Sequence, residues 1–157
     1  MSYFNNNIIF ASRENFVNSN YEKSTSVIIH IYDFINSVTI NKITINNLYD
    51  VHQIISYKNF ILITETGKNR IQVLNLETNK IDFFIEIGKI RSDKNHINAI
   101  NIDDNFIFIG LNNGHKKNLF QNAQLVKIPT YIIYQNKTID ALDVGILENL
   151  HNVFHTH

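Results

Sequence analysis

The chain has 157 residues, the size of one domain, so residues 1–157 are treated as a single domain. Hydrophobic residues make up 44% and charged residues 18% of it, a composition that excludes a disordered chain. The 14 basic residues balance the 14 acidic ones. Because no net charge attracts the protein to a phosphate backbone, we expect no nucleic acid partner.

The sequence contains no cysteine, which excludes disulfides, thiolate nucleophiles and cysteine-based zinc sites. The first residues have neither the basic nor the apolar segment of a signal peptide. No apolar run approaches the ~18 residues of a membrane span. We therefore expect a cytoplasmic protein that does not contact a membrane.

Isoleucine and asparagine dominate the sequence, with 28 and 25 residues against five glycines and one proline. Isoleucine favours strands, and asparagine tolerates the turn conformations that glycine would otherwise adopt. Apolar residues recur with a period of two, and no segment has the apolar stripe of an amphipathic helix. The pattern predicts an all-β protein whose first strands are residues 7–11, 27–35 and 42–45.

Two cycles of four predicted strands follow, separated mostly by short turn sequences. The first cycle comprises residues 51–56, 60–63, 70–76 and 81–87. The second comprises residues 96–102, 106–111, 123–128 and 138–144, with a long loop at 112–122. Residues 150–154 begin a further cycle.

The two cycles repeat one another: residues 50–55 align with 95–100, and residues 58–63 align with 104–109. His52 and His96 are 44 residues apart, and His96 and His151 are 55 residues apart. A four-stranded repeat of roughly 40–50 residues is typical of a β-propeller blade. The sequence therefore predicts a β-propeller-like meander of about three four-stranded blades, which is an incomplete propeller.

Residues 64–73, Thr-Glu-Thr-Gly-Lys-Asn-Arg-Ile-Gln-Val, resemble the blade turn of NHL-repeat and gluconolactonase-like propellers. Residues 96–100 and 145–151 resemble a less characterised bacterial propeller family, in which His-Ile-Asn and Leu-x-x-Pro-His steps open inner strands. Asn149 stands where that family usually has proline. The resemblance implies about six blades, so the chain looks like an N-terminal half. Because an unclosed fan of blades has open strand edges, we expect a homo-oligomer or a missing C-terminal half as partner.

Three histidines, His52, His96 and His151, are each predicted at the start of an inner strand, so their imidazoles would meet at one mouth of the channel. These histidines have three possible roles. They could cap the strands structurally, they could bind a polar ligand to which Asn98 would add an amide, or they could hold a catalytic Zn²⁺ ion. Such an arrangement of three histidines resembles the amidating-lyase branch of the NHL propellers, in which channel histidines hold zinc.

The turn formed by Glu65, Asn69 and Arg70 also has two readings. Arg70 would bind an anion, or the segment is a hairpin in which Asn69 is left-handed and Arg70 closes a surface ion pair.

No complete catalytic constellation is present in the sequence. We therefore expect a module that binds a small-molecule or protein ligand. The alternative is a metal-dependent lyase or hydrolase that uses His52, His96 and His151, with zinc as its cofactor.

Overall fold

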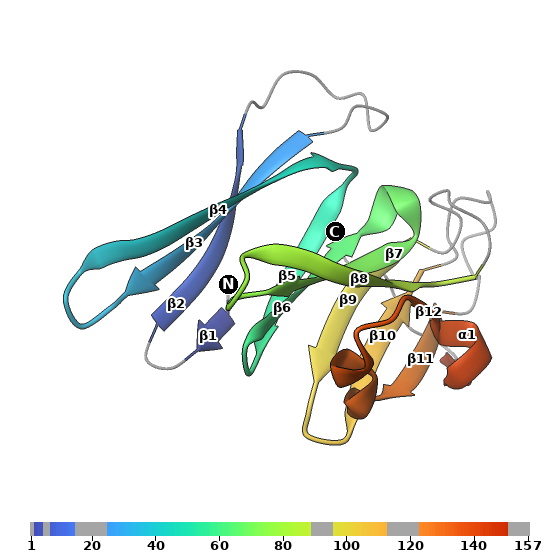
Figure 1. Cartoon of the computed structure of the whole chain (residues 1–157). Coiled ribbons are helices and arrows are strands. Elements are labelled where there is room, and N and C mark those ends of the chain that lie inside the picture. The colour runs from blue at the N-terminus through green and yellow to red at the C-terminus, as the bar shows by residue number, and fades with distance from the viewer. Residues whose placement is uncertain (1, 5–6, 15–24, 89–95, 113–122, 151–157) are drawn as a thin grey trace.

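The computed structural model describes residues 2–4, 7–14, 25–88, 96–112 and 123–150. These residues form an all-β protein of three sheets, as the alternating pattern predicts (Figure 1). Apart from one short parallel strand in the second sheet, neighbouring strands of each sheet are antiparallel. In the described part of the chain the three sheets form no closed barrel or ring.

The first sheet has the order β1-β2-β3-β4. Its strands are β1 (Ser2–Phe4), β2 (Asn7–Glu14), β3 (Thr25–Asp33) and β4 (Val38–Leu48). The hairpin of β3 and β4 projects away from the other two sheets (Figure 1).

The second sheet begins with the meander β5-β6-β7-β8. Its strands are β5 (Val51–Tyr57), β6 (Phe60–Glu65), β7 (Arg70–Asn75) and β8 (Lys80–Glu86), and the one-turn 3-10 helix η1 (Thr66–Lys68) joins β6 to β7.

The third sheet has the order β9-β10-β11-β13, with strands β9 (Ile97–Ile102), β10 (Phe106–Leu111), β11 (Ala123–Pro129) and β13 (Ile146–Leu150). Strand β5 lies beside both β1 and β9, so the first strands of the three sheets are neighbours. In the second sheet the strands follow in order from β5, which contains His52. In the third sheet they follow in order from β9, which begins directly after His96.

Asparagine performs the turn role that its abundance suggests. Asn47, Asn69, Asn79 and Asn136 all have positive φ values, between 48° and 59°. Asparagine tolerates this left-handed conformation better than other residues with a side chain, because its amide bonds locally to the backbone. The chain can thus make its tight turns with few glycines.

The apolar core consists of two layers, one on each face of the middle sheet. In one layer Ile9 and Ile29 of the first sheet pack with Ile61 and Ile63 of the second. In the other, Leu62, Val73 and Phe83 of the second sheet pack with Ile107, Ile109 and Val126 of the third. Successive residues of a strand point to opposite faces, so the continuous apolar run of β6 supplies both layers.

The prediction of a fourth strand at residues 138–144 is wrong. This segment contains a two-residue strand, β12 (Ile139–Asp140), and a one-turn helix, α1 (Ala141–Val144), preceded by the 3-10 helix η2 (Thr130–Gln135). β12 pairs in parallel with β8 and so extends the second sheet. The outer strand of the third sheet is instead β13, which pairs with β11.

The physical reason for this error is that apolar residues in the segment 130–145 are buried by tertiary contacts. Ile132, Ile133 and Ala141 belong to the core between the second and third sheets. The Asp140 carboxylate accepts hydrogen bonds from the backbone N–H groups of Gly88 and Leu142, at 2.9 and 3.0 Å. The segment therefore connects the second sheet to the third, a contact that we call the clasp. It also covers the edge of β8 that would otherwise be open.

Of the described helices, none is long and apolar enough to cross a membrane. The longest α-helix in the described residues has four residues.

Candidate functional site

The inner strands β5 and β9 enter their sheets in the same way. The backbone carbonyl of Asp50 accepts a hydrogen bond from Thr66, and that of His96 accepts one from Asn112, both at 3.0 Å. Asp50 and His96 also share a positive φ, 50° and 42°. The structural repeat therefore places Asp50 and His96, 46 residues apart in sequence, at equivalent positions.

This register corrects the sequence alignment around the histidines. Because Asp50 is equivalent to His96, His52 is equivalent to Asn98 rather than to His96. The aligned pair Phe60 and Phe106 already has the spacing of 46 residues. The two histidines are thus not repeats of one position, although both lie at the beginning of an inner strand.

Strand β5 contains a β-bulge at His52. Val51 pairs with Glu65 and Ile54 with Ile63, so two residues of β5 stand opposite Thr64 alone. The Thr64 hydroxyl accepts a hydrogen bond from the backbone N–H of Gln53 at 2.8 Å and donates one to its carbonyl at 3.1 Å. A side chain thereby replaces ladder bonds that the bulge interrupts, and the bulge redirects the side chains of the strand.

The redirected side chains connect the second sheet to the third. The Gln53 side-chain carbonyl accepts a hydrogen bond from the backbone N–H of Ile100 at 2.9 Å. The buried Thr66 hydroxyl donates to the carbonyl of Ile97 at 2.7 Å. These two bonds fix the relative position of the inner strands and therefore of the residues that begin them.

The imidazoles of His52 and His96 lie in edge-to-face contact. Their ring centroids are 5.2 Å apart, and the ring planes meet at 79°. The Nε2 atom of His52 is also 3.1 Å from the Asp50 carboxylate, which orients the ring. The side chain of His52 is 34% exposed, so a ligand can reach it.

Asn98 occupies the corresponding bulge of β9. Ile97 pairs with Leu111 and Ala99 with Gly110, which leaves Asn98 as the additional residue. Gly110 is equivalent to Thr64 and has no hydroxyl with which to fill this bulge. The Oδ1 atom of Asn98 is buried and has no hydrogen-bond partner in the described structure. An unpaired buried acceptor costs about 1–3 kcal/mol, so a hydrogen-bond donor brought against this atom would be stabilising.

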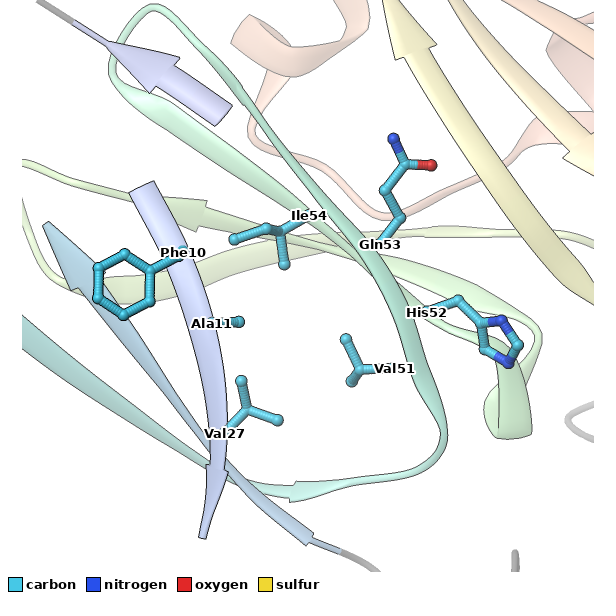
Figure 2. A pocket seen from close by; sticks show the side chains of 7 residues that line it. All are labelled: Phe10, Ala11, Val27, Val51, His52, Gln53 and Ile54. Carbon is cyan, nitrogen blue, oxygen red and sulfur yellow. The ribbon is translucent and has the colours of Figure 1, made fainter. Parts of the chain in front are cut away.

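A shallow pocket of about 240 Å³ lies on the other side of β5. Figure 2 shows Val51 and Ile54 pointing toward Ala11 of β2, whereas the ring of His52 points away from it. The lining on the β2 side is mainly apolar, because Phe10 and Val27 complete it. His52 and Gln53 also line this pocket, so it adjoins the polar cluster, by which we mean Asp50, His52 and His96 together with Asn98, two residues after His96.

The structure describes two of the three histidines that were expected to converge. His52 and His96 are neighbours, and His151 lies outside the described residues. Leu150, the residue before it, ends the outer strand β13. No group of three histidine, aspartate or glutamate side chains that could hold a metal ion exists among the described residues. They do not by themselves supply the three protein ligands of a catalytic zinc site.

The second predicted feature, the turn at Glu65, is a buried network rather than a surface pair. Asn69 has the expected left-handed conformation, with φ 54° and ψ 44°. The Glu65 carboxylate is fully buried, and it accepts hydrogen bonds from Arg70 at 2.5 Å, Gln72 at 2.8 Å and the Tyr49 backbone at 3.2 Å. The expectation of a surface pair is therefore wrong.

Arg70 is engaged on both sides, which argues against its use as an anion site. Its Nε atom bonds Glu65, and its guanidinium lies 4.2 Å from the centroid of the Phe84 ring. The sequence predicted the ion pair but not its burial, because burial depends on tertiary contacts such as those with Tyr49 and Phe84. Gln72 went unnoticed for the same reason.

Comparison with models of known protein families found no match, and a search of curated proteins found no significant match.

Proposed function

We propose that the protein is a fan of β-propeller blades, related in form to the NHL-repeat propellers, and that it binds a small polar molecule or a peptide segment at the polar cluster. The four-stranded meanders and the neighbouring positions of β1, β5 and β9 support the propeller arrangement. Repeat proteins of this kind commonly serve as binding platforms.

The observation that carries the binding proposal is the buried, unpaired Oδ1 atom of Asn98. It can accept a hydrogen bond from a donor such as a hydroxyl, an amide N–H or an ammonium group. His96 lies two residues before Asn98, and its ring contacts that of His52. The two imidazoles offer both hydrogen bonds and aromatic faces, so a ligand with a donor group and a planar or polar body suits the cluster.

The alternative, a metal-dependent lyase or hydrolase, would use the same two imidazoles. His52 and His96 would provide two of the three ligands of a zinc ion, and His151 was expected to provide the third. The proposal is a binding module, because the contacts of the described residues support a hydrogen-bonding site, whereas a zinc site would need His151, which lies outside the described residues.

The test is an NMR titration of the purified chain with a panel of polyols, monosaccharides and tripeptides, followed through the histidine ring resonances. Compounds that bind should shift the resonances of His52 and His96. Replacing Asn98 by leucine removes the acceptor and should weaken binding by about tenfold or more, since one lost hydrogen bond of about 1.4 kcal/mol is a factor of ten.

The matched control is His30→Gln, because His30 lies on the first sheet and bonds Ser12 there rather than any residue of the polar cluster. This variant should bind the same compounds with unchanged affinity. Binding that shifts only other resonances, or that Asn98→Leu leaves intact, would contradict the proposal. A parallel titration with Zn²⁺ addresses the alternative, which requires binding that fails in both His52→Ala and His96→Ala.

A further inference from the structure

The three sheets pack by one repeated rule. We call the face of a sheet that is turned toward the next sheet along the chain its forward face, and the opposite face its rear face. The forward face of the first sheet, with Ile9 and Ile29, packs on the rear face of the second, with Ile61 and Ile63. The forward face of the second sheet, with Leu62, packs in the same way on the rear face of the third. Each internal interface therefore joins one forward face to one rear face.

The third sheet has a forward face that no described sheet covers. Paired residues of neighbouring strands share a face, so Phe108, Lys127 and Ile146 lie there in one row, and Leu125 and Glu148 lie in the next. Ile146 is 61% exposed. The Lys127 ammonium lies 3.9 Å from the centroid of the Phe106 ring and 5.7 Å from that of Phe108. The face is thus aromatic and aliphatic, with one cation and one anion.

The first sheet has a rear face that is likewise uncovered by the described sheets. Phe10, His30 and Lys42 form one row across β2, β3 and β4, and Ile8 and Tyr32 form part of the next. The rings of Phe10 and His30 are stacked, with centroids 4.7 Å apart. Lys42 is exposed, and the other side chains of these rows are partly exposed.

We propose that these two faces bind each other between two copies of the chain, so that the forward face of the third sheet of each copy covers the rear face of the first sheet of the other. The repeated packing identifies the binding partner, because each forward face in this protein packs on a rear face. Among the described sheets, the rear face of the first sheet is the one that remains uncovered, so a second copy of the chain can provide it. A two-fold axis would form both interfaces at once, which closes the assembly as a dimer.

The two faces can bring one pair of opposite charges together. Glu148 lies on the outer strand β13 of the forward face, and Lys42 lies on the outer strand β4 of the rear face. Outer strands meet outer strands when sheets stack in register, so an acid on one copy faces a base on the other. Opposite charges at corresponding places fix the partner and its register.

The test is sedimentation velocity of the full chain from about 1 to 100 μM at pH 8, where histidines are neutral. The wild-type chain should form a dimer and no larger species. Lys42→Glu and Glu148→Lys should each weaken dimerisation by about tenfold or more, because each places like charges opposite one another. The double variant K42E/E148K should recover affinity to within about threefold of wild type.

Lys80→Glu is the control, because Lys80 is an exposed lysine of the middle sheet and should leave dimerisation unchanged. Thermal unfolding of every variant establishes that the chain remains folded. A folded wild-type monomer at 100 μM would overturn the proposal. So would an open series of higher oligomers, or a double variant that dimerises no better than the single ones.

Discussion

Replacing Glu65 by leucine removes the acceptor of three hydrogen bonds inside the protein. Arg70 and Gln72 lose their partner, as does the backbone N–H of Tyr49. Glu65 is fully buried, and the side chain of Arg70 is only 20% exposed. Breaking a buried ion pair from one side costs about 3–5 kcal/mol, because a charge is left in the interior without compensation.

The third sheet shows how the same space is filled without charge. The strand register makes Leu111 equivalent to Glu65, Gln124 to Arg70 and Val126 to Gln72. The triple variant Glu65→Leu, Arg70→Gln, Gln72→Val copies this solution. We expect it to regain most of the loss and to lie within about 1–2 kcal/mol of wild type, since a well-packed apolar replacement of a buried ion pair is often neutral.

The assay is equilibrium unfolding in guanidinium chloride, with far-UV circular dichroism as the signal. Asp104→Leu serves as control, because Asp104 is exposed, and a surface change of this kind should stay within about 0.5 kcal/mol. The reasoning is refuted if Glu65→Leu alone costs no more than the control. It is also refuted if the triple variant is as unstable as the single one.

Three further predictions concern single side chains. Thr64→Val, which removes the hydroxyl bonded to the Gln53 backbone, should cost about 1–3 kcal/mol in guanidinium unfolding, whereas an exposed threonine replaced by valine should not. Asp140→Ala removes the acceptor of two backbone N–H groups and should cost about 1–2 kcal/mol in the same assay. Burial and, second, Lys42 lower the pKa of His30 below 6.5, so the folded state binds fewer protons than the unfolded state. Stability should therefore fall as the pH is lowered through about 6.5, and His30→Gln should reduce this fall in urea titrations at pH 7.5 and 5.5.

Each of these three has an outcome that contradicts it. An unchanged unfolding midpoint for Thr64→Val would mean that the bulge is satisfied by other groups. An Asp140→Ala protein as stable as wild type would mean that the clasp contributes nothing to stability. A pH dependence that is the same with and without His30 would place the responsible protons on other residues.

The all-β fold was predictable because period-two alternation is a local property of the chain. Strands such as β7 and β10 carry it directly, and asparagine-rich turns separate them. The segment 138–144 was not predictable in the same way. Its apolar residues alternate as in a strand, but the edge of β8 captures only Ile139 and Asp140, and an N-cap at Asp140 begins a helix.

The proximity of His52 and His96 was predictable from their places at the start of inner strands, but their register was not, and ligand binding there stays a prediction. His52, His96 and Asn98 were identified because polar side chains at the start of inner strands face the centre of a propeller. The bulges were not visible, since they depend on how many residues of β5 and β9 stand opposite β6 and β10. One additional residue moves a side chain to the other face, so His52 corresponds to Asn98 and not to His96.

The difference between the two bulges leads to a final prediction about Gly110. In the second sheet Thr64 fills the bulge with its hydroxyl, and in the third sheet Gly110 leaves the equivalent place empty. A Cβ atom at Gly110 would lie 3.4 Å from that of Ala99, which is an ordinary contact, so a small side chain fits. Gly110→Ser should raise the free energy of unfolding by about 1 kcal/mol above Gly110→Ala, because its hydroxyl would face the backbone of Ala99 as Thr64 faces that of Gln53. Guanidinium unfolding of the two variants measures this difference, and the comparison with alanine removes the gain that any Cβ gives a strand. If serine is no more stable than alanine, the bulge of β9 already satisfies its backbone without a hydroxyl at position 110.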